Sequence, residues 1–366
     1  MRLKRKSPDV TILLAVVLLL MIGLLMVMSA SSVRASYEYE DPFFFFKRQM
    51  MFAVMGLAVL VVLMRFDYRR LSPIANGFLI VSLILLLALF IPGVGKKVLG
   101  STRWLNLGPA SFQPSELVKL AVIFFLAKAL SRDQHQLLDL FKGLGPYLAL
   151  MGFIGLVLVV QKDLGTALAI CGTMFLMLFV AGARTKHMGW LFGAGVGLVA
   201  LAAYIEPYRM RRITGFLDPE ADPQGAGYQL LQSLYALGGG GLFGSGLGQS
   251  KQKFFYLPEH HTDFIFAILG EEFGTLGAAV VIALFFLLIW RGIRVGVTCP
   301  DAFGSLLAVG LTAQVGLQAV INMGVVTGLL PVTGITLPFL SYGGSSLVFT
   351  LAGIGLLLSV SRYSPR

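Results

Sequence analysis

The sequence predicts an all-α polytopic membrane protein with ten transmembrane helices. Of its 366 residues, 57% are hydrophobic and only 13% are charged, whereas a soluble domain carries about 25% charged residues. The mean hydropathy is +0.82, and several apolar runs approach the roughly 20 residues that cross a bilayer. No linker or internal repeat divides the chain, so we expect a single integral membrane domain over residues 1–366.

Each predicted span is an apolar run between polar or Gly/Pro-containing segments. The first run follows MRLKRKSPDV and is longer than the roughly 7–15 residues of a signal-peptide core, which predicts an uncleaved helix. The fifth and sixth spans are separated only by Gln161, Lys162 and Asp163, which predicts a tight turn. The predicted spans are 10–33, 50–64, 74–91, 115–130, 144–160, 164–181, 188–205, 263–290, 303–330 and 345–360.

Two polar segments interrupt this pattern. The longer, 206–262, is a large extracytoplasmic loop between the seventh and eighth spans; YQLLQSLYAL within it predicts a short interfacial helix. The glycines that follow lack the setting of a phosphate-binding loop and indicate a flexible or closely packed loop. Between the last two spans lies PVTGITLPFLSYGG. Irregular backbone at membrane depth must line a cavity or be covered by protein, so we expect a re-entrant segment that walls an outer vestibule.

The positive charges set the expected orientation. With both termini in the cytoplasm, 16 of the 29 Lys and Arg residues lie inside and 13 outside; the basic N-terminus favours this arrangement because the first helix usually dominates. The same rule and anionic lipid explain the net charge of +11 without nucleic acid. The outer basic residues cluster, either by chance, for lipid contact, or as a vestibule for a phosphate or pyrophosphate. They include Lys96, Lys97, Arg103, Lys119, Arg209, Arg211, Arg212, Lys251 and Lys253.

The candidate chemistry lies in YLPEHHTDFIFAILG, residues 256–270. There Glu259, His260, His261 and Asp263 meet the start of the eighth span. Our hypothesis is that Asp263 is a general base. Thr262 or Asp263 could alternatively cap the following helix, which stabilises a first turn by about 1 kcal/mol, and the two roles are not exclusive. Adjacent histidines suit a transition metal poorly, whereas a hard divalent cation could bridge a carboxylate and a substrate pyrophosphate.

Further charges fall within or beside predicted spans. Glu271 and Glu272 would cost about 2.5–3.5 kcal/mol each at a helix centre, so we expect either a buried ion pair that ties two spans together or a binding role. Glu116 and Lys119 are i,i+3 neighbours, which indicates a surface ion pair at a helix start, or Lys119 placed with Arg103 against an anion. The two cysteines give no disulfide framework.

Together these motifs resemble the SEDS family (shape, elongation, division and sporulation proteins), in its FtsW/SpoVE branch, which is related to RodA. One departure is Lys162, where the family usually has proline. The matching stretches are GSTRWLNLGPASFQPSELVKLA, QKDLGTAL, FLDPEADPQGAGYQLLQSLYALGGGGLFGSGLGQS, FYLPEHHTDFIFAILGEEFG and NMGVVTGLLPVTGITLPFLSYGGSS.

The resemblance implies a multi-pass peptidoglycan glycosyltransferase of the bacterial cytoplasmic membrane, with its active site outside, that polymerises lipid II into β-1,4 glycan strands for division, sporulation or elongation. Asp263 would take the proton from the 4-hydroxyl of the acceptor N-acetylglucosamine, which attacks C1 of the donor N-acetylmuramic acid with inversion. The expected partners are lipid II, the undecaprenyl-pyrophosphate-linked glycan and a class B penicillin-binding protein. A lipid II flippase and a non-catalytic scaffold stay open as alternatives.

The same resemblance assigns the substrate site. Arg103 and Lys119, helped by Mg²⁺ or Mn²⁺ and without an organic cofactor, would meet the charge of the leaving pyrophosphate, and Glu116 and Asp163 would orient them. The implied substrate-binding residues are Arg103, Lys119, Glu116, Asp163, Lys47, Arg48, Arg212, Glu259, His261, Ser341 and Tyr342.

Overall fold

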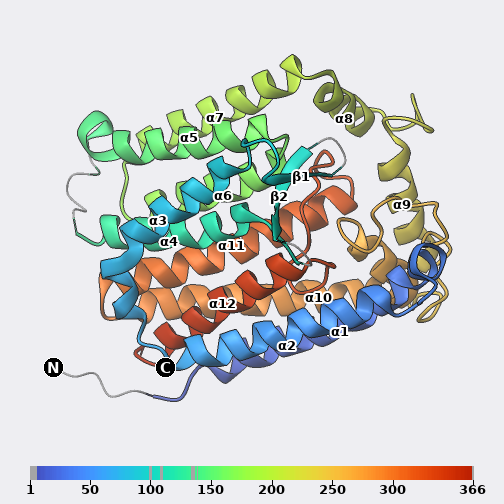
Figure 1. Ribbon diagram of the computed structural model, residues 1–366, viewed down its shortest axis with the longest axis horizontal. Coiled ribbons are helices and arrows are strands. Elements are labelled where there is room, and N and C mark those ends of the chain that lie inside the picture. Colours follow the sequence, from blue (N-terminus) through green and yellow to red (C-terminus); the bar gives the residue numbers. More distant parts are fainter. Residues whose placement is uncertain (1–5, 99–100, 108–109, 133–136, 138, 365–366) are drawn as a thin grey trace.

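The protein is an elongated helical bundle in which α1 begins and α12 ends at the same end (Figure 1). The computed structural model describes residues 6–98, 101–107, 110–132, 137 and 139–364. The helices are α1 (Val10–Tyr39), α2 (Phe44–Arg65), α3 (Leu71–Ala88), α4 (Pro114–Leu130), α5 (Gly145–Val160), α6 (Leu164–Val180), α7 (Thr185–Ile205), α8 (Pro207–Leu217), α9 (Tyr228–Gly240), α10 (Ile265–Thr298), α11 (Ala302–Val326) and α12 (Gly344–Ser361).

The predicted all-α polytopic fold is confirmed, and every predicted span falls on a helix. Eight helical stretches are long and apolar enough to cross a membrane. The helices α4 and α6 have 17 residues each, so the total of ten spans stays a prediction. The loop 206–262 holds α9, the predicted interfacial helix, and also α8, which the sequence did not predict.

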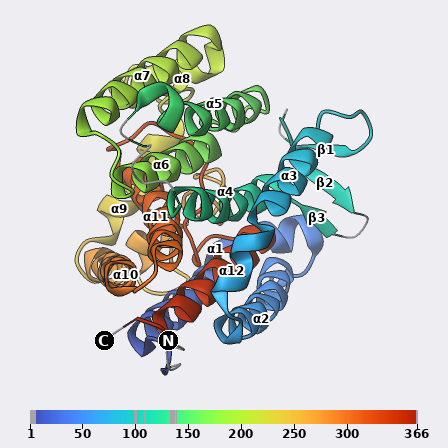
Figure 2. The ribbon, with the colours of Figure 1, turned by 90° about the vertical axis from the view of Figure 1, so that its left-hand side faces the viewer.

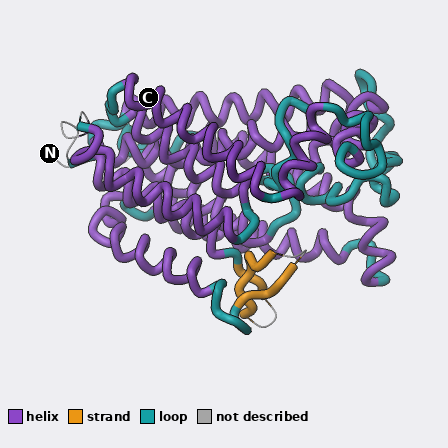
Figure 3. Tube along the Cα trace, turned by 90° about the horizontal axis from the view of Figure 1, so that it is seen from above, coloured by secondary structure: helices purple, strands orange, loops and turns teal. Residues whose placement is uncertain are grey.

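A small antiparallel sheet lies between α3 and α4, where we expected only a loop. Its strands are β1 (Gly95–Val98), β2 (Ser101–Leu107) and β3 (Ala110–Phe112), in the order β1-β2-β3. Figure 2 shows the sheet beside α3, and Figure 3 shows the longer loops gathered at the end of the bundle away from both termini. We call this end, away from both termini, the outer end. Arg103 lies on β2 of the sheet.

The helix α11 forms the centre of the bundle. It packs against α10, α4, α6 and α12, and Figure 2 shows it enclosed among them. Its polar residues Gln314, Gln318 and Asn322 are all buried, and their spacing of four places them on one face of the helix. This face runs toward the outer end, where the irregular segment 327–343 begins.

Glu271 and Glu272 form a buried network that ties three parts of the chain together, as one of our two alternatives predicted. Glu272 accepts a hydrogen bond from Ser29 Oγ of α1 at 2.6 Å and lies 3.4 Å from Lys253 Nζ. Glu271 accepts from Ser250 Oγ at 2.5 Å. Both carboxylates thereby hold the loop before Asp263 against α1 and α10, at the point where Gly274 breaks α10 with φ of 68°.

The glycine run at the end of α9 is closely packed, which is one of the two states we expected for it. A Cβ atom at Gly240 would lie 2.0 Å from the carbonyl oxygen of Gly270 in α10, a distance that no side chain tolerates. A Cβ atom at the preceding residue, Gly239, would meet no atom within 4 Å. The contact of α9 with α10 therefore depends on Gly240.

We expect Gly240→Val to destabilise the protein because the added side chain must push α9 away from α10. Overpacking of this kind costs about 1–3 kcal/mol, so the midpoint of thermal unfolding in detergent should fall. The matched control is Gly239→Val, which adds the same side chain to the same helix where space is open. Equal unfolding midpoints for the two variants would contradict the contact.

Candidate active site

Asp263 lies in the turn immediately before α10, at the outer end of the bundle. The residue that caps α10 is Phe264, and no side-chain hydrogen bond caps this helix, so the capping alternative for Asp263 is wrong. Across the described part of the chain, no donor binds the Asp263 carboxyl group. Its Oδ2 atom lies 3.5 Å from the position that a Cβ atom would take at Gly334, which leaves the carboxyl facing the segment 331–343.

Four charged groups surround the Asp263 carboxyl. Removal of water from the charged form raises its pKa to about 7, with a further rise from Glu259. Arg212 and Arg103 oppose this rise, and Asp163 adds to it slightly. A carboxyl with this pKa is ionised and still basic near neutral pH, which are the two properties that a general base requires.

Arg103 reaches the site from β2. Its Nη1 atom lies 3.7 Å from Asp163 Oδ1, and its Nη2 atom donates to the carbonyl of Lys162. Asp163 also accepts from the backbone N–H of Thr166 at 3.2 Å and so caps α6. Lys162 has φ of 61°, which a proline ring cannot adopt. Lys162 is thus compatible with this turn, and Asp163 caps the helix that follows.

Arg212 reaches the site from α8. It donates to the carbonyl of Val332 at 2.9 Å and to the hydroxyl of Tyr208, whose ring lies beneath it at 4.6 Å. Arg209, one turn earlier, donates to the carbonyl oxygens of Val159 and Ala202. The helix α8 is thus held across the ends of α5 and α7, with one arginine directed at the segment 331–343.

The segment 331–343 walls the site, in line with the expected re-entrant segment, and its backbone is bonded to its surroundings. Asn322 donates to the carbonyl of Asp263 at 2.7 Å and to that of Ile335 at 2.6 Å. Ser341 Oγ donates to the carbonyl of Thr262 at 2.5 Å. Our sequence analysis missed Asn322; the four-residue spacing of Gln314, Gln318 and Asn322 was the available signal.

Glu116 and Lys119 form an ion pair of 2.8 Å, but it is buried, with side-chain exposures of 6% and 7%. The interpretation as a surface ion pair is therefore wrong. Lys119 Nζ also lies 3.2 Å from Gln318 Oε1, and Gln318 Nε2 donates to the carbonyl of Thr336 at 3.0 Å. The pair thus supports the segment 331–343 from below.

The other predicted site residues lie in two groups, one in and around the turn of Asp263 and one at the start of α2. His261 packs between the rings of Phe45 and Tyr342, and the backbone N–H of Tyr342 donates to the carbonyl of His261 at 3.0 Å. Burial lowers the pKa of His261 to about 3, so it is neutral. Glu259 contacts Arg34 and Thr262.

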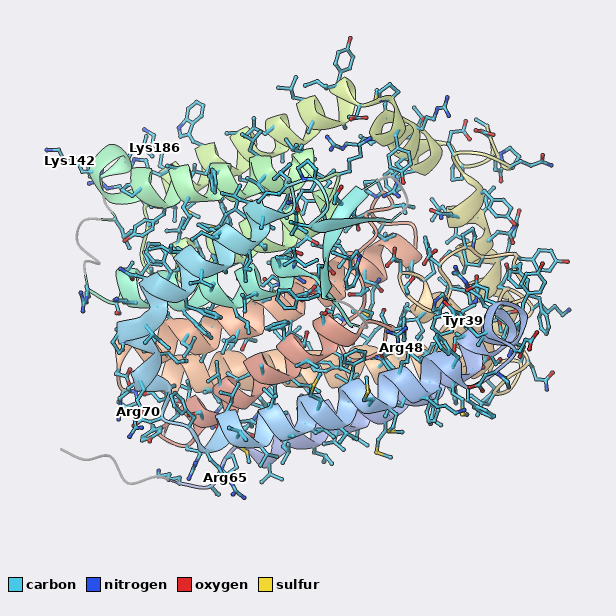
Figure 4. All side chains as sticks on the ribbon, in the orientation of Figure 1. Tyr39, Arg48, Arg65, Arg70, Lys142 and Lys186 are labelled. Carbon is cyan, nitrogen blue, oxygen red and sulfur yellow. The ribbon has the colours of Figure 1, made fainter. Side chains whose placement is uncertain are left out.

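Lys47 and Arg48 lie at the start of α2. Lys47 pairs with Asp41 at 2.8 Å with its side chain 67% exposed, and Arg48 lies over the ring of Phe44. Figure 4 shows Arg48 on α2 at the same end of the bundle as Tyr39. Of the basic side chains predicted for the site, Arg103 and Arg212 are thus the two whose charges act on Asp263. The side chains of Lys96 and Lys97 lie outside the described part of the structure.

Among the residues that the structure describes, no three His, Cys, Asp or Glu side chains come together as a metal site. The Nδ1 atom of His260 lies 2.7 Å from the carbonyl oxygen of Leu257, which occupies that ring nitrogen. The positive charges that act on Asp263 are those of Arg103 and Arg212.

Comparisons with known proteins agree with this architecture. The family model of FtsW, RodA and SpoVE, described as cell cycle protein, matches residues 10–366. Stage V sporulation protein E of Bacillus subtilis is 49% identical over 100% of both chains. The probable peptidoglycan glycosyltransferase FtsW of Geobacter sp. strain M18 is 46% identical over 96% of each chain. A chain solved in a peptidoglycan synthase complex that coordinates polymerization and crosslinking is 32% identical, with a TM-score of 0.78 over 97% of this chain and 98% of that one.

We expect Lys119→Met to destabilise the protein strongly because it leaves the Glu116 carboxylate buried without its partner. Breaking a buried pair in this way costs about 3–5 kcal/mol. The double variant Glu116→Gln/Lys119→Met removes both charges and should recover much of the loss, as measured by thermal unfolding in detergent. Lys128→Met, at the exposed end of the same helix, is the control; a double variant no more stable than Lys119→Met would contradict the pairing.

Proposed function

Since the chain belongs to the FtsW, RodA and SpoVE family and is a peptidoglycan glycosyltransferase, we propose that it polymerises lipid II with Asp263 as general base. The observation that carries this proposal is the Asp263 carboxyl itself. It has a pKa of about 7, lies at the outer end of the bundle, and faces the segment 331–343 with two arginines near it. The substrate and the role of each residue are our proposal.

In the proposed reaction, the Asp263 carboxylate takes the proton of the 4-hydroxyl group of the acceptor N-acetylglucosamine. The hydroxyl oxygen attacks C1 of the donor N-acetylmuramic acid while the bond from C1 to the phosphate oxygen breaks. Undecaprenyl pyrophosphate leaves with the bonding electrons, and the new β-1,4 link has inverted configuration. The proton stays on Asp263 until it passes to water, so the charges balance.

Arg103 and Arg212 would stabilise the negative charge that develops on the leaving pyrophosphate. Their guanidinium groups are suited to phosphate oxygens because they present paired N–H donors in a plane. Arg212 keeps one bond to Val332 and Arg103 one to Lys162, which fixes both heads before substrate arrives. Fixed donors that need no reorganisation are the usual source of transition-state stabilisation. We propose that any Mg²⁺ or Mn²⁺ enters bound to the pyrophosphate of the substrate.

We further propose a division of labour among the remaining predicted residues. Lys119 and Glu116 are bonded within the bundle and would act by supporting the segment 331–343. Ser341 and Tyr342 would hold the turn of Asp263 through their bonds to Thr262 and His261. This leaves Arg103, Arg212 and Asp263 as the groups that face substrate.

We propose that the site faces outside, on the side of the membrane where glycan strands are made. Arg65, Arg70, Lys142 and Lys186 lie at the end where α1 begins (Figure 4), and the positive-inside rule assigns that end to the cytoplasm. A class B penicillin-binding protein is the partner that we propose. The similar chain in a peptidoglycan synthase complex supports it.

Asp263→Asn should abolish polymerisation of purified lipid II by the complex with its transpeptidase partner. The amide has the shape of the carboxyl but cannot accept the proton, and loss of a general base typically lowers a rate by about 10²–10⁴-fold. Glycan chains would be resolved on gels after a fixed reaction time. Glu220→Gln, the same change at an exposed carboxyl of the loop 206–262, is the control, and unchanged polymer from Asp263→Asn would contradict the general base.

The rate should rise with pH through neutrality. Asp263 must be ionised to accept a proton, and its pKa is about 7. We therefore expect kcat/KM to be half-maximal near pH 7 and level above pH 8. Below pH 7, kcat/KM should fall toward a slope of about tenfold per pH unit. Initial rates of lipid II consumption across this range measure the profile, with unfolding midpoints taken at each pH. A rise centred near pH 4 would mean that the surroundings of Asp263 do not raise its pKa.

A further inference from the structure

The turn that presents Asp263 is organised by Glu259. Glu259 has φ of 52°, in the left-handed region, where non-glycine residues are uncommon and cluster at functional sites. Its carbonyl accepts hydrogen bonds from the N–H groups of Thr262 and Phe264, both at 3.2 Å. Its carboxylate accepts from Thr262 Oγ1 at 2.9 Å. Glu259 thus holds the turn that leads into α10 through both its backbone carbonyl and its side chain.

The same carboxylate is attached to the outer end of α1. Arg34 Nη1 lies 3.6 Å from Glu259 Oε1, while Arg34 Nε donates to Glu38 at 2.8 Å. A second contact joins α1 to the loop before this turn: the ring centroids of Tyr37 and Phe255 lie 5.7 Å apart. Together with the bond from Ser29 to Glu272, they fasten the outer half of α1 along the whole turn and the start of α10.

Charges reach the Asp263 carboxyl from four elements, and they are not equally neutralised. Arg212 comes from α8, Arg103 from β2, Asp163 from the start of α6 and Glu259 from the turn itself. Asp163 is paired directly with Arg103. Glu259, in contrast, shares its only arginine in the described structure with Glu38. Glu259 is therefore the negative neighbour of Asp263 whose charge is least compensated.

Resting on the proposed function, we propose that the ion pair of Arg34 and Glu259 is a positioning element of the transferase: through it, α1 fixes the turn of Asp263 and keeps a second carboxylate beside it. Glu259 does not contact the sugars in this proposal. Its negative charge disfavours ionisation of Asp263 and thereby keeps the base strong near neutral pH, whereas Arg34 limits that effect. The helix α1 then sets the pH at which the enzyme works.

The test is the pH profile of lipid II polymerisation by the complex with its transpeptidase partner, for four variants. In Glu259→Gln the midpoint should move to lower pH, so that at pH 6 the variant keeps a share of its plateau rate about threefold larger than the wild type does. In Arg34→Gln it should move to higher pH. Glu259→Asp, which restores the charge, should return it toward the wild-type value. Glu38→Gln, which leaves Arg34 to Glu259 alone, should move it to lower pH, opposite to Arg34→Gln.

The outcomes separate this inference from the general base. If Asp263→Asn makes no polymer but Glu259→Gln and Arg34→Gln lower only the plateau, with midpoints at the wild-type pH, the pair is merely structural and the inference is overturned. Polymer from Asp263→Asn would overturn both proposals. Should Glu259→Gln fail to fold, as judged by its unfolding midpoint, the midpoints of Arg34→Gln and Glu38→Gln still decide the matter: displacement in opposite directions supports the inference, and no displacement in either variant overturns it.

Discussion

The structure depends on the high free energy of an unpaired charge inside an apolar bundle. Burying an ion costs several kcal/mol unless it is paired and hydrogen-bonded, and the interior carboxylates away from the turn satisfy this condition. Glu272 has Ser29 and Lys253, Glu116 has Lys119, and Asp163 has Arg103 together with the first turn of α6. The pairs of Glu272 and Asp163 join outer segments to the helices, whereas the pair of Glu116 lies within α4. These two charges therefore attach outer segments to the bundle, whereas no donor among the described residues binds the half-buried Asp263 carboxyl.

The segment 331–343 turns these separate attachments into one site. Gln318 and Asn322, on one face of α11, bind its carbonyl groups from below. Arg212 binds it from α8, and Ser341 returns from it to the turn of Asp263. Backbone without regular structure must find partners in the protein when it lies at membrane depth. Here the partners are residues that also contact the turn of Asp263. The same hydrogen bonds therefore satisfy the backbone of this segment and fix the geometry of the candidate site.

The sequence predicted the helices well because apolar length is a strong signal, and it predicted the pairing of Glu272 because an isolated charge in a span is too costly. It did not predict the sheet, whose short strands lack a clear alternation, or α8, whose Arg209 and Arg212 suggested a loop. The end of α1 was placed too early, since Arg34 and Glu38 look like a loop by composition yet pair along the helix. Asp263 as a site residue stays a prediction, and the capping alternative could be removed only by coordinates. The burial of Lys119 likewise depends on how α4 packs against α11, which spacing within one helix does not determine.

The arrangement around Asp263 separates what must be rigid from what must be free. The main chain of the turn is fixed by bonds at three successive positions: Tyr342 to His261, Ser341 to Thr262, and Asn322 to Asp263. None of these bonds uses the Asp263 carboxyl. A donor there would lower the pKa and occupy the lone pair that has to take the proton. In the reaction that we propose, a fixed backbone and a side chain with no donor among the described residues place the base before substrate binds, which is the condition under which proximity lowers a barrier. At this half-buried carboxyl, a sugar hydroxyl would be the donor in the reaction that we propose.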